Sequence, residues 1–324
     1  MRILLTHSPE ARSLYYGERA LAGLRKAGDV KLNENPQSLE GEELIKAAAD
    51  CDLIVSYRQS PGPATLFERL PRLVAFLRCA IDIRNIDLAA ASKAGVLVTQ
   101  ASAGFVTSVS EMVLGFLVDL SRGVTRSTIE YRAGRVPKAV MGKELKGSTI
   151  GVIGYGQIGR EVVRLCKALG MKVLIHDPYK KVRQVTLEKL FKESDYVVPL
   201  AVATAETENL IDRNALGKMK RGAYLVNVSR GNLVDEAALA SALDAGHLAG
   251  VALDVGRAPD QMPTPQLAAR ADVIATPHTA GLTLPAIEHQ SMQTVAQAAA
   301  IAKGKAPKGA VNPKDWKRRS LLRK

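Results

Sequence analysis

Three glycines stand between an apolar segment and a helical segment in the stretch "TIGVIGYGQIGREVV". Gly154, Gly156 and Gly159 form the pattern GxGxxG. In such a turn the first glycine permits the tight bend, the second lets a pyrophosphate approach the backbone, and the third allows close helix packing. Free N–H groups at a helix N-terminus favour negative charge. The turn, with Gln157 and Ile158, is therefore predicted to bind a dinucleotide.

Asp177 ends the next apolar segment, "KVLIHD". A carboxylate at this place accepts hydrogen bonds from a ribose 2′,3′-diol and repels a 2′-phosphate. The cofactor predicted from this position is NAD rather than NADP. Lys180, Lys181 and Arg183 follow closely and weaken that preference without reversing it.

Three further polar residues follow apolar segments downstream, namely Arg230, Asp254 and His278. Open α/β sheets bind ligands at the carboxyl ends of their strands. A guanidinium there binds a carboxylate and polarises a carbonyl, and a histidine exchanges a proton near neutral pH. The alternative for Arg230 is a surface cation paired with Asp235 or Glu236.

Short apolar segments alternate with segments of helical period, which predicts parallel strands joined by crossover helices. The first part has expected strands and helices at residues 2–7, 42–50, 52–57, 73–80, 85–95 and 96–100. Six strands after Thr149 match the size of a doubly wound nucleotide-binding domain. Long helical patterns cover residues 107–133 and 282–304, and the second is expected to return the chain to the first domain.

Several of these stretches together resemble one known family. They are "GVIGYGQIG", "HDP", "NVSRGNLVDEAAL", "HLAGVALDV" and "TPHTAG", over residues 85–281, with "GAVNP" near the C-terminus. In this order and spacing they resemble the D-isomer-specific 2-hydroxyacid dehydrogenases. The resemblance implies an α/β fold of two doubly wound parallel-sheet domains. A Rossmann NAD-binding domain, residues 101–283, is then inserted in a flavodoxin-like substrate domain, residues 1–100 plus 284–324.

The resemblance also implies an activity, that of an NAD-dependent D-2-hydroxyacid dehydrogenase or 2-oxoacid reductase. Arg230 would bind and polarise a small anionic substrate, and His278 would be the general acid/base. Asp254 would hold the nicotinamide ribose or carboxamide, and Val228 and Ser229 would line the cofactor. Glyoxylate, hydroxypyruvate and 3-phosphoglycerate are family-level substrates, and a homodimer is expected through the helical pattern at residues 107–133.

Three places depart from the family pattern, and one of them is Leu200, where the family often has a histidine near the cofactor. Pro259 occupies the position of the glutamate that usually partners the histidine, so Asp260 is predicted to replace it as the third catalytic residue; the alternative is a loop carboxylate facing water. Ala80 and Asp82 replace glycines of a loop that binds the substrate carboxylate. Asp82 is unfavourable there unless it faces away or pairs with Arg84. These departures motivate the alternative of an NAD-binding regulatory or interaction protein with little turnover.

Composition and charge argue against several other classes of protein. The 324 residues carry a formal charge of +13, partly from a basic tail after Lys303, which is interpreted as a solvated, frayed end rather than a nucleic-acid arm. The three cysteines lie far apart, and no histidine pair has metal-ligand spacing, so neither a disulfide framework nor a metal site is expected. No long apolar run or signal peptide is evident, which favours a cytoplasmic protein without membrane contact.

Overall fold

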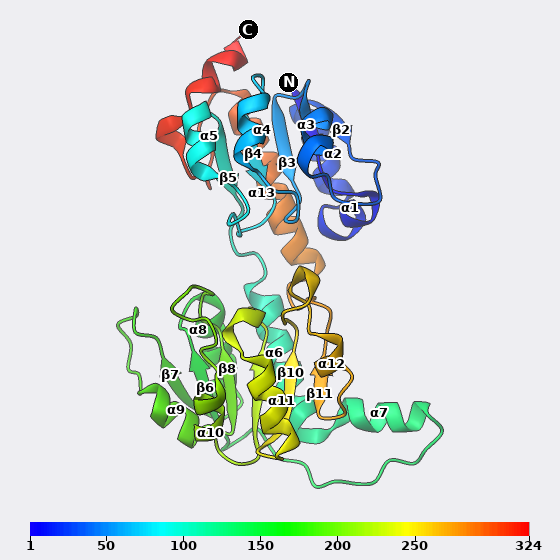
Figure 1. Cartoon of the computed structure of the whole chain (residues 1–324), viewed down its shortest axis with the longest axis vertical. Coiled ribbons are helices and arrows are strands. Elements are labelled where there is room, and N and C mark those ends of the chain that lie inside the picture. The colour runs from blue at the N-terminus through cyan, green and yellow to red at the C-terminus, as the bar shows by residue number, and fades with distance from the viewer. Residues whose placement is uncertain (324) are drawn as a thin grey trace. The chain divides into compact units, whose positions relative to one another are not determined.

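The structure is a computed structural model that describes residues 1–323. Its contacts divide the chain into two compact units (Figure 1). Unit 1 is Met1–Phe105 with Leu282–Lys324, and unit 2 is Val106–Gly281. The sequence-based domain limits, with residues 101–283 inserted, remain a prediction. Each unit builds its own sheet and its own cores.

Unit 1 contains a five-stranded parallel sheet with the order β2-β1-β3-β4-β5. Its strands are β1 (Arg2–Leu5), β2 (Asp29–Leu32), β3 (Leu53–Ser56), β4 (Ala75–Arg78) and β5 (Leu97–Gln100). Its helices are α1 (Pro9–Tyr15), α2 (Glu18–Ala27), α3 (Gly41–Ala48), α4 (Ala64–Arg69), α5 (Leu88–Ala94) and α13 (Leu284–Ala302). This order is the flavodoxin-like doubly wound arrangement.

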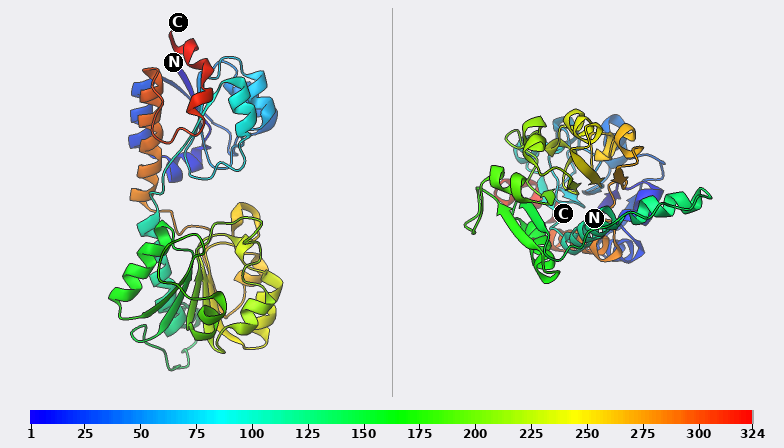
Figure 2. Two further views of the ribbon diagram at one scale, coloured as in Figure 1. Left: turned by 90° about the vertical axis from the view of Figure 1, so that its left-hand side faces the viewer. Right: turned by 90° about the horizontal axis from the view of Figure 1, so that it is seen from below.

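Both faces of this sheet are covered, which explains why β3 and β4 are continuously apolar up to their last residues. Leu5 and Val55 belong to a core shared with α2 and α13. Leu4 and Ile54 face the opposite side and belong to a core shared with α3, α4 and α5. Figure 2 shows helices on both sides of the sheet.

The C-terminal segment is docked on unit 1. Trp316 is buried, and its indole N–H donates to the Val74 carbonyl at 3.2 Å. Arg318 Nη1 donates to the carbonyl oxygens of Leu70 at 2.5 Å and Leu73 at 3.0 Å. Short 3-10 helices cover Pro313–Asp315 and Lys317–Arg323. The prediction of a frayed tail was therefore wrong up to residue 323; Lys324 lies outside the described residues.

Unit 2 contains a six-stranded parallel sheet with the order β11-β10-β9-β8-β6-β7. Its strands are β6 (Thr149–Ile153), β7 (Lys172–His176), β8 (Tyr196–Pro199), β9 (Ala223–Asn227), β10 (Leu248–Leu253) and β11 (Val273–Ala275). The chain reverses its direction of winding between β6 and β8, and doubly wound sheets bind ligands at the carboxyl edge of such a point.

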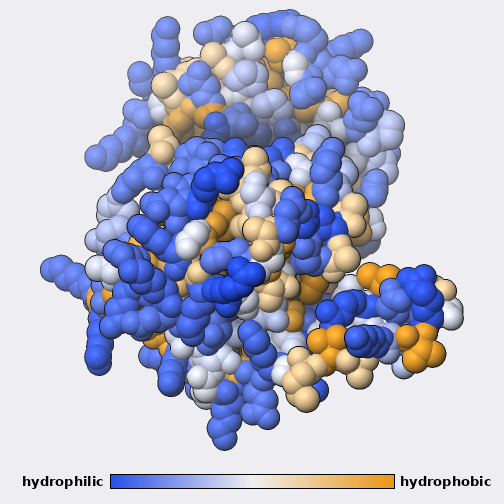
Figure 3. Space-filling view, turned by 60° about the horizontal axis from the view of Figure 1, so that its bottom comes forward, coloured by the Kyte–Doolittle hydropathy of each residue, from blue (hydrophilic) through white to orange (hydrophobic). Residues whose placement is uncertain are grey.

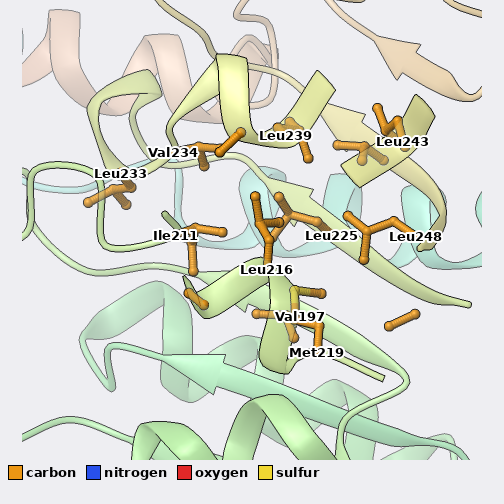
Figure 4. Packing of buried hydrophobic residues seen from close by; sticks show 14 of the residues in the cluster. Val197, Ile211, Leu216, Met219, Leu225, Leu233, Val234, Leu239, Leu243 and Leu248 are labelled. Carbon is orange, nitrogen blue, oxygen red and sulfur yellow. The ribbon is translucent and has the colours of Figure 1, made fainter. Parts of the chain in front are cut away.

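Helices cover both faces of the unit 2 sheet. They are α6 (Val106–Arg122), α7 (Val124–Arg132), α8 (Gln157–Ala168), α9 (Leu187–Glu193), α10 (Arg213–Lys218), α11 (Glu236–Asp244) and α12 (Pro265–Ala268). Figure 4 shows how Leu216, Leu225 and Leu239 pack in the core that α10 and α11 share with the sheet. Asp212 and Asp235 start these two helices, because their carboxylates accept from the N–H groups of Ala215 and Ala238.

The helical pattern predicted over residues 107–133 is two helices. Gly123 has a φ of +65°, a left-handed conformation that ends α6 and starts α7. We call residues 124–141 the α7 arm. It exposes several large apolar side chains (Figure 3), which are Val124, Ile129, Tyr131, Val136, Val140 and Met141. Within residues 1–323, no helix has the length and apolar content needed to cross a membrane.

Candidate active site

The glycine turn links β6 to α8 and is packed on one side only. Gly154 has a φ of +99°, and a Cβ there would lie 2.7 Å from the Leu200 carbonyl. A Cβ on Gly159 would lie 2.1 Å from the Gly154 oxygen, so the third glycine lets the helix close on the turn itself. Gly156, the residue before α8, would place its Cβ in open space. That open side at a helix N-terminus fits a pyrophosphate.

Asp177 follows β7 and lies beside the glycine turn. The Tyr155 N–H donates to Oδ2 at 2.7 Å, and the Tyr179 N–H donates to Oδ1 at 2.9 Å. These bonds fix the orientation of a largely buried carboxylate, and each oxygen keeps a further acceptor position. The carboxylate is therefore placed to accept hydrogen bonds from a ribose.

Replacing Asp177 by alanine is expected to weaken the preference for NADH over NADPH by about tenfold or more, since hydrogen bonds to a charged group contribute about 1.5–3 kcal/mol each. Loss of the carboxylate also removes the repulsion of a 2′-phosphate. The ratio of kcat/KM for the two cofactors measures the effect. Asp195→Ala is the control, because Asp195 lies before β8, at the other edge of the sheet. An unchanged ratio in Asp177→Ala would contradict the assignment.

Arg230 lies just beyond the carboxyl end of β9, in a segment whose conformation is fixed by hydrogen bonds to the Asn227 side chain. The Asn227 amide donates to the Arg230 carbonyl at 2.9 Å and accepts from the Ser229 N–H at 3.1 Å. Ser229 Oγ also donates to the Ala201 carbonyl at 3.1 Å, which joins this segment to the loop after β8. Sequence reasoning missed Asn227; its signal was a polar residue at the end of a buried strand.

Asp254 is buried after β10 and anchors the segment that carries His278. Its carboxylate accepts from the Thr276 hydroxyl at 2.6 Å, the Thr279 N–H at 2.8 Å and the Ala280 N–H at 3.0 Å. The His278 N–H donates to the Asp254 main-chain carbonyl at 2.9 Å. The structure therefore shows Asp254 holding the histidine loop, and the cofactor contact predicted for Asp254 stays a prediction.

His278 follows β11 and has a left-handed φ of +54°. Its Nδ1 lies 2.7 Å from the main-chain carbonyl oxygen of Asp260. A carbonyl oxygen only accepts, so Nδ1 carries a proton and Nε2 is the nitrogen that can gain or lose one. The structure thus shows a main-chain contact between Asp260 and His278. The role predicted for the Asp260 carboxylate stays a prediction.

Replacing Asp254 by alanine is expected to destabilise unit 2 by about 3 kcal/mol, because buried N–H donors that lose their acceptor cost about 1–3 kcal/mol each. Circular dichroism during thermal unfolding measures the effect. Asp212→Ala is the control, since loss of an exposed helix cap costs about 1 kcal/mol. If Asp254→Ala costs no more than this control, the anchoring role is contradicted.

Two other sequence-based expectations concern the Asp82 side chain in unit 1 and a metal site. Asp82 pairs with Arg84, whose Nε donates at 3.0 Å and whose Nη2 donates at 2.5 Å. This confirms the pairing that would spare an anionic substrate from an uncompensated carboxylate. Among residues 1–323, no group of three or more His, Cys, Asp or Glu side chains is arranged to hold a metal ion.

Comparison with known proteins identifies similar chains. Residues 114–280 match the family model described as D-isomer specific 2-hydroxyacid dehydrogenase, NAD binding domain. A hydroxypyruvate reductase from Thermotoga maritima is 32% identical over 82% of this chain and 89% of its own length. A glyoxylate reductase from Korarchaeum cryptofilum is 30% identical over 91% and 93%. The solved structure of the TT0316 protein from Thermus thermophilus covers 96% of this chain and all of its own, with a TM-score of 0.87 and 29% identity.

Proposed function

This chain belongs to the D-isomer-specific 2-hydroxyacid dehydrogenase family, and we propose that Arg230 and His278 carry its chemistry. As a member, the chain is an NAD-dependent oxidoreductase that acts on the CH–OH group of 2-hydroxy acids. The observation that best supports the proposed roles is the hydrogen bond from His278 Nδ1 to a main-chain carbonyl. It places a proton on Nδ1, so the proposal assigns proton exchange to Nε2, at the edge of the sheet that also carries the glycine turn.

In the proposed mechanism, residues at the carboxyl edge of the unit 2 sheet have separate roles. The chemistry that bound NAD would supply is hydride transfer to or from the substrate carbon. The turn from Gly154 to Gly159 would hold the pyrophosphate, Asp177 would hold the ribose, and Val228 and Ser229 would line the cofactor. Arg230 binds the substrate carboxylate through two N–H groups and polarises the neighbouring carbonyl. His278 gives its Nε2 proton to the carbonyl oxygen during reduction and takes it back during oxidation.

Glyoxylate and hydroxypyruvate are the substrates that we propose. The support is that the reductases named for these compounds match this chain along most of their length. The test measures NADH consumption with a panel of 2-oxo acids of increasing size. Turnover confined to the smallest acids would support the proposal. If only larger acids were reduced, the substrate would need revision, and if none were, the proposed activity would fail.

We also propose a two-fold homodimer that buries the α7 arm. Ile129 and Tyr131 are 56% and 65% exposed, which is a large apolar surface for a single helix. Light scattering at micromolar concentration is expected to give the mass of two chains, and Ile129→Asp with Tyr131→Asp is expected to give one. Val202→Asp, at a residue 79% exposed elsewhere in unit 2, is the control. A monomeric wild-type protein would contradict the dimer.

We propose the cytoplasm as the location of the protein. The support is that Cys51, Cys79 and Cys166 are all unpaired and buried, as is usual in a reducing compartment. Cell fractionation with a tagged chain tests the location, and recovery in an oxidising compartment would contradict it.

A further inference from the structure

The carbonyl group that accepts from His278 lies in a tight loop after β10, which we call the 256–262 hairpin. The Gly256 N–H donates to the Gln261 carbonyl at 2.8 Å, and the Ala258 N–H donates to the Met262 carbonyl at 3.0 Å. Asp260 and Gln261 have φ values of +56° and +57°. Two consecutive left-handed residues that are not glycine are unfavourable and persist only where the surroundings hold them.

Glu236, near the start of α11, bonds to the first part of this hairpin and to Thr264, two residues beyond its end. Its Oε1 accepts from the Arg257 N–H at 2.9 Å, and its Oε2 accepts from the Thr264 hydroxyl at 3.0 Å. A single carboxylate therefore ties the start of the hairpin to the segment that follows it.

The Arg257 side chain joins the hairpin to two neighbouring loops. Its Nη2 donates to Glu208 Oε1 at 2.8 Å and to Asn209 Oδ1 at 2.6 Å, in the loop after β8. Its Nε donates to the Val234 carbonyl at 3.3 Å, in the loop after β9. The hairpin and the loop after β9 also touch directly, since a Cβ on Gly231 would lie 2.1 Å from the Gly256 oxygen. Gly231 directly follows Arg230.

We propose that Arg257 is a positioning residue for His278 and Arg230, acting through the 256–262 hairpin. A carboxylate partner can adjust by rotating its side chain, whereas a main-chain carbonyl goes where its loop goes. The orientation of the His278 ring therefore depends on the contacts that fix that loop. Arg257 supplies a rigid connection through several hydrogen bonds. This inference rests on the proposed roles of His278 and Arg230.

The test compares Arg257→Ala with Arg270→Ala. Arg270 is a matched control because it is similarly half-buried in unit 2 and donates to Asp244 at 2.7 Å and to Asp272 at 2.8 Å. Asp272 precedes β11, so this network lies at the edge of the sheet opposite His278. Arg257→Ala is expected to lower kcat by about 10- to 100-fold, the effect of a small misplacement of a catalytic group. Arg270→Ala is expected to retain its kcat.

Three readouts separate positioning from a general loss of structure. The dissociation constant for NADH should stay unchanged in Arg257→Ala, because the glycine turn and Asp177 lie outside its hydrogen bonds. Arg257→Lys should recover part of the lost kcat, since it keeps the charge without the fork of donors. Thermal unfolding of both alanine variants shows whether the kcat loss exceeds what their stabilities explain.

The outcomes are distinct. A wild-type kcat in Arg257→Ala, or equal losses in Arg257→Ala and Arg270→Ala, would overturn the inference and leave the proposed function standing. If Arg257→Ala does not fold, Arg257→Lys and Glu236→Gln decide in the same way. Asp260→Asn keeps the carbonyl and tolerates a left-handed φ. A larger kcat loss in Asp260→Asn than in Arg257→Ala would assign the role to the carboxylate and overturn the inference.

Discussion

Replacing Arg230 by alanine is expected to lower kcat/KM for a 2-oxo acid by about 10³-fold, which corresponds to about 4 kcal/mol of transition-state stabilisation. The guanidinium is the one group that the proposed mechanism assigns to both the substrate carboxylate and the carbonyl. Its removal therefore weakens binding and chemistry together. Steady-state kinetics with NADH held at saturation measure the loss.

Two companion variants define what the Arg230 result means. Arg230→Lys keeps a positive charge but not the planar fork, so most of the loss should remain. Arg221→Ala removes an exposed arginine just before β9 and should leave kcat/KM unchanged. Full activity in Arg230→Ala would contradict the proposed role and favour the alternative that Arg230 is a surface cation.

Unit 1 is expected to lose stability steeply in acid because of His7. Burial, with smaller contributions from the charges of Arg78 and Arg12, lowers the pKa of His7 from 6.5 to about 3. The unfolded chain thus binds a proton that the folded chain does not bind between these values. The stabilisation is complete above pH 6.5 and is lost as the pH falls towards 3, and its size is about 4–5 kcal/mol at 1.36 kcal/mol per pKa unit.

Trp316 is the single tryptophan and is buried in unit 1, so its fluorescence during urea unfolding reports on that unit. Plotted against pH, the free energy of unfolding should fall less steeply below pH 6.5 in His7→Leu than in the wild type. His289→Leu is the control, because this histidine is exposed in the same unit. Equal slopes in His7→Leu and the wild type would contradict the account.

Most of the fold was predictable because buried parallel strands are continuous apolar segments between helical ones. β2 was missed because its sequence, "DVKL", is half polar and lies at the edge of the sheet. The break at Gly123 was hidden by helical periodicity on both sides of it. The prediction for the tail was wrong because its charges outnumber its apolar residues, although Trp316 is buried in the core and Leu322 packs against it.

The site was predictable to the extent that side chains alone define it. Gly154, Asp177 and Arg230 lie after β6, β7 and β9, at the strand ends that their motifs implied, and their roles stay predictions. The main-chain contact of His278 was not predictable, because a main-chain carbonyl has no sequence signature, and the Asp260 carboxylate stays a predicted partner. Arg257 was missed for a related reason, since its hydrogen-bond acceptors come from loops that are separated along the chain.

The most direct test of the central claim is the pH dependence of 2-oxo acid reduction by the wild type and His278→Asn. Asparagine tolerates the left-handed backbone of residue 278, so the loop should survive the change. The account predicts that wild-type kcat falls as rising pH removes the imidazole proton. His278→Asn should lose about 10²- to 10⁴-fold in kcat together with that pH dependence, while still binding NADH. A variant that keeps wild-type kcat and the same pH profile would contradict His278 as the acid/base of this enzyme.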